Sequence, residues 1–244
     1  MKSLVLGGTQ GMGRSLARLL SERGDAVCLL GRDAEALEKS ADDLRARGAN
    51  DVATVICDLS DDAGFDAALN QAEQQLGGLD LVVVTAALFA AQDDLENDSA
   101  RTAALLDLNF TKTILFCEAA RKRLLATGGG TLCVFSSVAG ERGRKPVVLY
   151  GATKAGLSAY LEGLDHKFRS AGLITVCVKP GFVRTAMTAG LKPPPFAGEP
   201  DGVARRVLRA IDRGKPVVYA PAIWCWIMWV IRSLPRAIMR RIDF

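Results

Sequence analysis

The stretch SLVLGGTQGMGR, residues 3–14, joins a short apolar run to a glycine turn and then to a helix-like sequence. Residues 3–6 are typical of a buried strand, and apolar residues recur at helical spacing over residues 14–23. Backbone N–H groups of a turn between a strand and a helix N-terminus can approach a pyrophosphate, and the helix dipole favours its negative charge. The glycines are spaced G-x-x-x-G-x-G, at Gly7, Gly11 and Gly13. We predict a pyrophosphate-binding turn, with a plain glycine-rich turn as the alternative.

Short apolar runs alternate with helix-like stretches along nearly the whole chain. The predicted strands are continuous apolar runs, as expected of parallel strands buried on both faces: 3–6, 26–30, 52–57, 81–85, 131–135, 174–178 and 216–219. Between and after them we predict helices over 14–23, 34–47, 63–76, 100–126, 152–170 and 202–213. This alternation predicts an α/β fold with a doubly wound parallel sheet of about seven strands.

Composition excludes several classes of protein. Of 244 residues, 49% are apolar and 24% are charged, which is ordinary for a folded globular protein and excludes general disorder. The net charge of +4 comes from scattered residues, without the basic run that binds nucleic acid. The six cysteines never form C-x-x-C, so we interpret them as small buried side chains, and the single His166 cannot build a metal site by itself. Because the N-terminal apolar run is too short for a signal peptide, we expect a cytoplasmic protein.

The second predicted strand ends just before Gly31 and Arg32, about 20 residues after the glycine turn. In NAD-selective sites an acidic residue at this place binds the ribose 2′-hydroxyl. Gly31 has no carboxylate to repel a 2′-phosphate, and the Arg32 guanidinium can bind one. Thr9 and Arg14 can add to the same pocket. We therefore predict NADP(H) as the cofactor, with a solvated surface charge as the alternative interpretation of Arg32.

A possible acid–base pair lies in the second half of the chain. Tyr150 and Lys154 are four residues apart, which places them on one face of a helix. A phenol has a pKa of about 10, and a neighbouring ammonium lowers that pKa by stabilising the phenolate. Thirteen residues before Tyr150, Ser137 follows a predicted strand, and the carboxyl ends of strands are where doubly wound sheets bind ligands.

Together these pieces resemble the classical short-chain dehydrogenase/reductase family over essentially the whole chain. The matching pieces, in chain order, are the turn at residues 7–13, Asp58 with Leu59, Asn109, Ser137, Tyr150 with Lys154, and the segment PGFVRT at residues 180–185. The resemblance implies a single-domain Rossmann fold over residues 1–221 and an NADP-dependent activity that interconverts carbonyl compounds and alcohols. It also implies a homodimer or homotetramer.

The resemblance also implies roles for individual residues. It implies that Tyr150 is the general acid–base and that Ser137 hydrogen-bonds the substrate oxygen. Lys154 would bind the nicotinamide ribose and lower the pKa of the tyrosine, and Asn109 would hold a water molecule in a proton relay. Asp58 would contact the adenine of the cofactor, and Thr185 would contact the nicotinamide carboxamide. With the residues of the 2′-phosphate pocket included, the residues expected to contact the cofactor are Gly7, Thr9, Gly11, Met12, Gly13, Arg14, Arg32, Asp58, Leu59, Ala86, Tyr150, Lys154, Pro180, Gly181, Val183 and Thr185.

One departure from the family pattern lies after the fourth predicted strand. The family sequence N-N-A-G is replaced by Val84, Thr85, Ala86 and Ala87. The first asparagine of that motif helps to hold the central sheet, so we expect the support to come from another residue. No catalytic group is lost, and this favours an active enzyme over the alternative of a non-catalytic nucleotide-binding or scaffold protein with the same fold.

Residues 222–244 form an unusual C-terminus with all three tryptophans of the protein, Trp224, Trp226 and Trp229. The apolar run is about half the length needed to span a bilayer. Arg232, Arg236 and Arg240 are spaced by four, which predicts one helical face. We expect a helical extension of the same domain that either docks peripherally on the inner membrane face or packs over the substrate cleft or a partner subunit. Either case favours an apolar, lipid-like substrate, and residues 193–196 are expected to cover the cleft.

Overall fold

The computed structural model describes residues 1–242, so Asp243 and Phe244, the end of the predicted 222–244 extension, lie outside the described residues. Its centre is a parallel sheet of seven strands in the order β3-β2-β1-β4-β5-β6-β7. The strands are β1 (Lys2–Leu6), β2 (Ala26–Gly31), β3 (Val52–Ile56), β4 (Leu81–Val84), β5 (Gly130–Phe135), β6 (Leu173–Pro180) and β7 (Val217–Ala220). The predicted doubly wound parallel sheet is confirmed.

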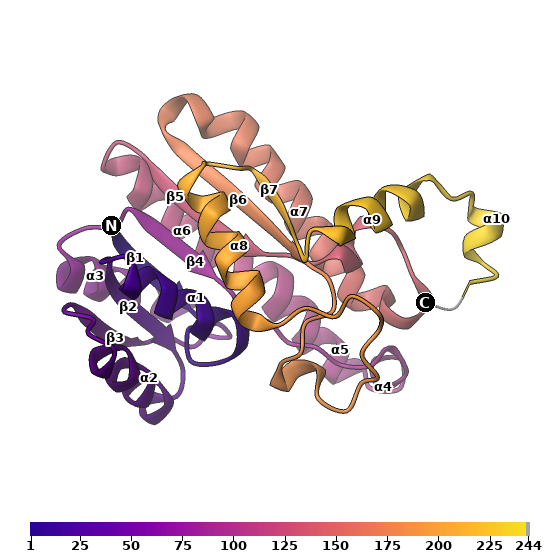
Figure 1. Ribbon diagram of the computed structural model, residues 1–244, viewed down its shortest axis with the longest axis horizontal. Helices are drawn as coiled ribbons and strands as arrows, with labels where there is room; N and C mark the ends of the chain where they lie inside the picture. Colours follow the sequence, from indigo (N-terminus) through magenta and orange to yellow (C-terminus); the bar gives the residue numbers. More distant parts are fainter. Residues whose placement is uncertain (243–244) are drawn as a thin grey trace.

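Helices cover both faces of the sheet (Figure 1). One face carries α1 (Gly11–Glu22), α2 (Ala34–Ala46) and α8 (Pro200–Asp212), and the other carries α3 (Phe65–Leu76), α6 (Thr113–Ala126) and α7 (Val148–Phe168). Strand β1 shows why its sequence is apolar throughout: Val5 packs into the first layer, whereas Leu4 and Leu6 pack into the second. Alternate side chains of a strand point to opposite faces, so a strand covered on both sides needs an unbroken apolar run.

The helix predicted over residues 100–126 is three consecutive segments. These are α5 (Ser99–Leu106), a π-helical turn η2 (Asp107–Lys112), and α6. The wider turn is stabilised by Thr113, whose hydroxyl donates to the carbonyl of Leu108 at 2.8 Å. A short helix α4 (Gln92–Glu96) precedes α5, and the connecting 3₁₀ turns are η1 (Asp62–Gly64), η3 (Val138–Glu141), η4 (Lys145–Val147), η5 (Arg169–Ala171) and η6 (Ala186–Thr188).

The C-terminal segment extends away from the sheet (Figure 1). It consists of α9 (Ile223–Ser233) and α10 (Arg236–Met239), so the predicted single arginine face is wrong. Pro235 separates the two helices. A proline has no N–H to donate to the preceding turn, and its ring clashes with the carbonyl four residues earlier, so α9 cannot continue through it. Trp224 is buried in α9, whereas Trp226 and Trp229 are 70% and 60% exposed. None of the helices in the described residues is long and apolar enough to cross a membrane.

The cysteines agree with the sequence analysis at five of six positions. Cys28, Cys57, Cys117, Cys133 and Cys177 are buried, but Cys225 is exposed on α9. Its side chain lies on the solvent side of α9, because the buried stripe of that helix runs through Trp224, Met228 and Ile231. The prediction of a buried side chain is therefore wrong for Cys225.

Candidate active site

The glycine turn after β1 is packed so tightly that side chains are excluded from it. Gly7 has a φ of +88°, and a Cβ atom there would lie 2.6 Å from the Thr85 hydroxyl oxygen. A Cβ at Gly13 would lie 2.2 Å from the carbonyl oxygen of Gly7. The turn therefore brings its glycine backbone directly to the N-terminus of α1, and this cradle fits the pyrophosphate of a dinucleotide.

Thr85 provides the support that the missing asparagine was expected to provide. Its hydroxyl lies 3.1 Å from the carbonyl oxygen of Leu6 and 3.0 Å from that of Gly7. The backbone N–H of Thr85 also donates to the Leu6 carbonyl, at 2.9 Å. One threonine after β4 therefore ties the end of β1 and the first glycine of the turn to the neighbouring strand.

Ser137, Tyr150 and Lys154 line one cavity of about 500 Å³ at the carboxyl end of the sheet. Ser137 follows β5 and accepts a hydrogen bond from the backbone N–H of Ala139 at 3.0 Å. Tyr150 and Lys154 both lie on α7, and the Lys154 Nζ atom is 5.7 Å from the centroid of the Tyr150 ring. Nζ also donates to the carbonyl of Phe135 at 2.9 Å, which fixes the ammonium beneath the cavity.

Burial dominates the pKa values of this group. It raises the pKa of Tyr150 to about 12, and a hydrogen bond with Ser137 acts in the opposite direction. Burial likewise lowers the pKa of Lys154 to about 8. The expected lowering of the tyrosine pKa by the ammonium is not found, because the loss of hydration on burial outweighs the effect of the Ser137 hydrogen bond. Near neutral pH the site holds a neutral phenol and a mostly charged ammonium.

Asn109 lies in the π-helical turn η2 and is completely buried. Its side chain makes two hydrogen bonds with the backbone of Leu88: Oδ1 accepts from the N–H at 2.7 Å, and Nδ2 donates to the carbonyl at 2.8 Å. Asn109 therefore holds the chain that leaves β4 against the helix layer, next to the cavity-lining Ala87 and Phe89.

The residues expected to bind the adenosine end lie at the carboxyl ends of β1, β2 and β3 and in the first turn of α1, outside this cavity. Asp58 accepts hydrogen bonds from the N–H and hydroxyl of Ser60, and these bonds and the charge of Arg32 lower its pKa. Arg32 is exposed. Arg14 pairs with Asp43 of α2 at 3.3 Å, so its charge is shared with that carboxylate. Thr9 is half-buried in the turn, and Leu59 is buried.

Most of the other predicted cofactor residues surround the cavity itself. A Cβ at Gly7 would lie 2.8 Å from the backbone nitrogen of Ala86, and a Cβ at Gly11 would lie 3.3 Å from the methyl carbon of Thr185. The glycine turn is therefore in contact with the chain after β4 and with the chain after β6. The cavity lining includes Met12, Pro180, Gly181, Val183 and Thr185.

The cavity lining is mainly apolar. The ring of Phe89 packs edge-on against Tyr150 with centroids 5.2 Å apart. Leu191 and Pro194 line the cavity from the loop that includes residues 193–196, whereas Phe196 is 61% exposed. The site can therefore hold an apolar molecule with its oxygen directed to Ser137 and Tyr150.

Trp224 is a cavity residue that no motif marks. A Cβ at Gly181 would lie 2.0 Å from its indole Nε1, so the ring packs directly on the Gly181 backbone, and Trp224 is 8% exposed. Packing over the cleft was one of the alternatives for the tryptophan-rich segment, and it holds for this tryptophan. The sequence contains a glycine after β6 and an aromatic residue after β7, but no local pattern connects the two. Sequence reasoning therefore did not place Trp224 at the cavity.

Comparison with known proteins gives consistent matches along the chain. A family model for short chain dehydrogenases matches residues 2–195. An uncharacterized oxidoreductase of Mycobacterium tuberculosis is 32% identical over 238 residues, which cover 98% of this chain and 95% of the relative. An uncharacterized oxidoreductase of Streptomyces coelicolor is 34% identical over 249 residues, with 98% and 94% covered. The structure of an actinorhodin polyketide ketoreductase with NADPH has a TM-score of 0.81 at 22% identity and covers 89% of this chain and 94% of its own.

Proposed function

Because the chain belongs to the short-chain dehydrogenase/reductase family, we propose that it is an NADP(H)-dependent oxidoreductase that reduces a ketone or aldehyde to an alcohol, or catalyses the reverse oxidation. The observation that carries the proposal is the cavity in which Ser137, Tyr150 and Lys154 meet beside the glycine turn. This arrangement places an acid, a hydrogen-bond donor and a positive charge where a carbonyl oxygen would lie.

NADPH, when bound, supplies a hydride to the carbonyl carbon. The Tyr150 hydroxyl, protonated near neutral pH because its pKa is raised, donates its proton to the carbonyl oxygen as negative charge develops there. Ser137 hydrogen-bonds the same oxygen and orients it toward the phenol. The Lys154 ammonium stabilises the phenolate that remains. In the oxidation direction the phenolate takes the proton back from the alcohol.

The apolar lining around Phe89, Leu191 and Trp224 supports an apolar or lipid-like body for the substrate. Gly31 and the exposed Arg32 at the end of β2 support NADP(H) over NAD, since no carboxylate stands at the end of that strand and a guanidinium follows it. Asp33 is the next acidic residue along the chain. Its carboxylate accepts a hydrogen bond from the backbone N–H of Ala36 at 3.0 Å and so caps the N-terminus of α2.

The test of this function is a Tyr150→Phe variant assayed by NADPH absorbance with a panel of ketones and aldehydes. Removal of the acid should lower the rate by roughly 10²–10⁴-fold, with NADPH binding retained. Tyr160→Phe is the matched control, because Tyr160 lies on the same helix and its hydroxyl bonds Glu118. Unchanged activity in Tyr150→Phe would show that the acid–base assignment is wrong.

A non-catalytic nucleotide-binding or scaffold protein is the competing function. Such a protein would bind NADPH but would oxidise none of it with any member of the panel. The joint presence of Asn109, Ser137, Tyr150 and Lys154 favours the enzyme, because nucleotide binding by itself requires no proton donor directed at an apolar cavity.

We also propose that the protein is cytoplasmic and that it forms a homodimer or homotetramer. The exposed apolar side chains of Leu106, Phe110 and Leu115, along α5, η2 and α6, support the assembly. Residues 222–244 are proposed to extend the domain of residues 1–221 and to touch the inner membrane face through the exposed indoles of α9.

A further inference from the structure

A glutamine on the short helix α4 is bonded to the helix that carries Tyr150. Gln92 is only 8% exposed, although glutamine side chains are mostly found at protein surfaces. Its Oε1 atom accepts a hydrogen bond from the backbone N–H of Leu149 at 3.1 Å, and its Nε2 atom donates to the carboxylate of Glu96 at 2.8 Å. Leu149 directly precedes Tyr150, so this side chain meets α7 beside the proposed acid.

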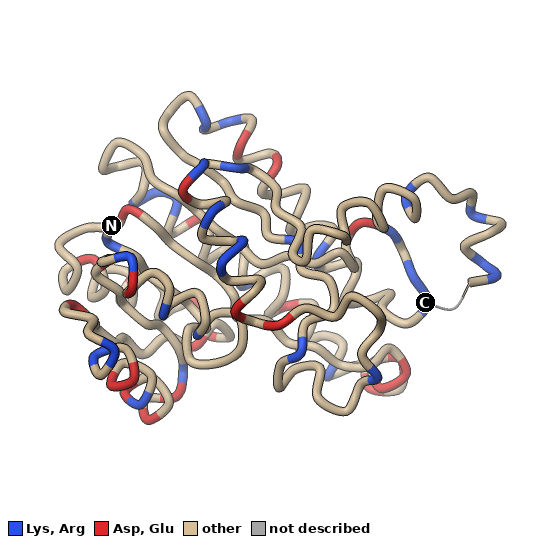
Figure 2. The backbone as a smooth tube through the Cα atoms, viewed as in Figure 1, with Lys and Arg blue, Asp and Glu red and all other residues tan. Residues whose placement is uncertain are grey.

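The two partners determine which way the amide of Gln92 faces. The Leu149 N–H can only donate and the ionised Glu96 carboxylate can only accept, so the amide oxygen faces α7 and the nitrogen faces Glu96. Gln92 and Glu96 are four residues apart on α4, which is the spacing at which helical side chains meet. Figure 2 shows acidic residues along α4, and Glu96 is the one that Gln92 contacts. The acceptor is therefore already oriented toward the Leu149 N–H.

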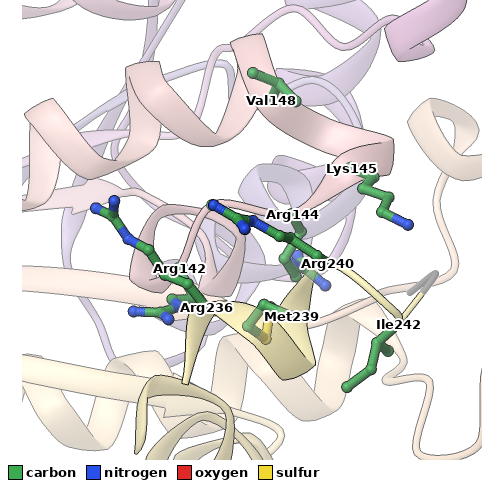
Figure 3. A pocket seen from close by; sticks show the side chains of 9 residues that line it. Arg142, Arg144, Lys145, Val148, Arg236, Met239, Arg240 and Ile242 are labelled. Atoms are coloured by element: carbon green, nitrogen blue, oxygen red, sulfur yellow. The ribbon is translucent and has the colours of Figure 1, made fainter. Parts of the chain in front are cut away.

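The first turn of α7 needs such an acceptor. The first N–H groups of a helix have no partner within the helix itself. Val147, at the position before α7, has an aliphatic side chain that cannot accept a hydrogen bond. Figure 3 shows the start of α7 at Val148, which the chain reaches from Arg142 and Lys145. Gln92 therefore supplies from α4 the cap that the residue next to α7 lacks.

The following turn of α7 is held by other contacts. Lys154 donates from Nζ to the carbonyl of the last residue of β5 at 2.9 Å, and its own carbonyl accepts from the Ser136 hydroxyl at 2.8 Å. Tyr150 lies between this anchor and the Gln92 bond, and its ring packs on Phe89 from the same segment as Gln92. Loss of the Gln92 bond would loosen the turn that carries Tyr150 and leave Lys154 in place.

A proton donor acts only within hydrogen-bonding reach of the atom that receives the proton, and a misplacement of about 1 Å can cost on the order of 10²-fold in rate. We propose that Gln92 is a positioning residue of the active site, whose amide holds the first turn of α7 and so sets the place of the Tyr150 hydroxyl in the cavity. This inference rests on the proposed role of Tyr150 as the acid. Gln92 acts on that residue through the backbone of Leu149.

The first experiment separates the acceptor of Gln92 from the space that its side chain fills. Gln92→Met keeps a long side chain and removes the acceptor, whereas Gln92→Glu keeps an oxygen that can accept from the Leu149 N–H. With a carbonyl substrate from the panel, Gln92→Met should lower kcat roughly tenfold or more, with KM and the dissociation constant of NADPH little changed. Gln92→Glu should retain most of the kcat, because a carboxylate is also favourable at a helix N-terminus. An equal fall in both variants, or none in Gln92→Met, would overturn the proposal.

Asp98→Ala is the matched control, because it removes a cap from a helix that carries no residue of the proposed site. The Asp98 carboxylate accepts from the backbone N–H of Arg101 at 2.9 Å at the start of α5. Chemical denaturation should show a loss of stability in both Asp98→Ala and Gln92→Met, but kcat should fall only in Gln92→Met. A similar fall of kcat in Asp98→Ala would mean that lost stability lowers the rate, and the positioning role would be wrong.

The last experiment observes Tyr150 without turnover. The protein has three tyrosines, so labelling with ¹³C-tyrosine gives few ring signals in the NMR spectrum, and Tyr150→Phe identifies the one from Tyr150. This signal should shift in Gln92→Met and stay near its wild-type position in Gln92→Glu. If the wild type reduces no member of the panel, the proposed function fails, whereas the ring signal still tests the position of Tyr150. An unchanged signal in Gln92→Met would show that Gln92 does not position the tyrosine.

Discussion

The Thr85 hydroxyl lies 3.0 Å from the carbonyl oxygen of Gly7, and this contact connects β4 to the glycine turn after β1. The same hydroxyl is 3.1 Å from the Leu6 carbonyl, so its one proton is shared by two acceptors at the end of β1. A Cβ at Gly13 would lie 2.5 Å from this oxygen, so Thr85 also fills the space against the first turn of α1. The position of the cofactor cradle therefore depends on a side chain from another strand.

Thr85→Val should lower the free energy of unfolding by about 1 kcal/mol, because it keeps the shape of the side chain and removes the shared hydrogen bond. Thr85→Ser keeps the hydroxyl and should retain NADPH affinity better than the valine variant. Chemical denaturation and fluorescence titration with NADPH measure the two effects. If valine and serine weaken NADPH binding equally, the hydroxyl does not hold the turn.

Lys154 should make the stability of the protein depend on pH. Burial lowers its pKa to about 8 in the folded protein, against about 10.4 in the unfolded chain. Between these values the unfolded chain binds more protons, so stability rises with pH across this window, and the full cost of burying the charge is present below about pH 8.

The comparison with Lys154→Met isolates this effect, because methionine does not titrate. The stability of the wild type relative to the variant should increase between about pH 7.5 and pH 9.5, by on the order of 1–3 kcal/mol. Loss of the bond to the Phe135 carbonyl is independent of pH and cancels in the difference. A relative stability that stays level or falls over this range would contradict the lowered pKa.

Arg32→Asp should reverse the order of cofactor affinities. The wild type is expected to bind NADPH more tightly than NADH, and the variant should prefer NADH, because a carboxylate repels the 2′-phosphate and accepts the ribose hydroxyl. Arg45→Asp makes the same charge change on the exposed side of α2 and should leave the order unchanged. Equal or tighter NADH binding by the wild type would refute the assignment to NADP(H).

The parts of the structure that follow local patterns were predictable, and the parts set by distant contacts were not. Continuous apolar runs located all seven strands because both faces of the sheet are covered. The break at η2 has no glycine or proline to signal it. It coincides instead with contacts across the fold, where the Asn109 side chain bonds the backbone of Leu88. The same reason explains Trp224: its place at the cavity depends on packing against Gly181, which lies 43 positions earlier in the sequence.

Leu106→Glu should shift the protein from an oligomer to a monomer. Leu106 is 37% exposed and lines a hollow with Phe110 and Gly156 between the η2 region and α7, where a second copy can cover apolar surface. A buried glutamate without a partner would oppose that contact. Ile56→Glu, at a site that is 64% exposed on β3, is the control. Light scattering after size-exclusion chromatography measures the mass, and an unchanged mass for Leu106→Glu would place any interface elsewhere.

The exposed tryptophans of α9 should report contact with a membrane surface. Trp226 and Trp229 are exposed while Trp224 is buried, so a change in their surroundings dominates any change in the emission. We expect a blue shift on addition of vesicles that contain anionic lipid, because the indoles enter the headgroup region and the exposed Arg240 and Arg241 attract the surface. High salt should reverse the shift by screening these charges, and Arg236→Gln/Arg240→Gln should keep most of it because the indoles remain.

Trp226→Phe/Trp229→Phe retains only the buried indole and should show little shift. Absence of both a spectral change and sedimentation with vesicles would refute the membrane contact and favour packing of α9 against a partner subunit.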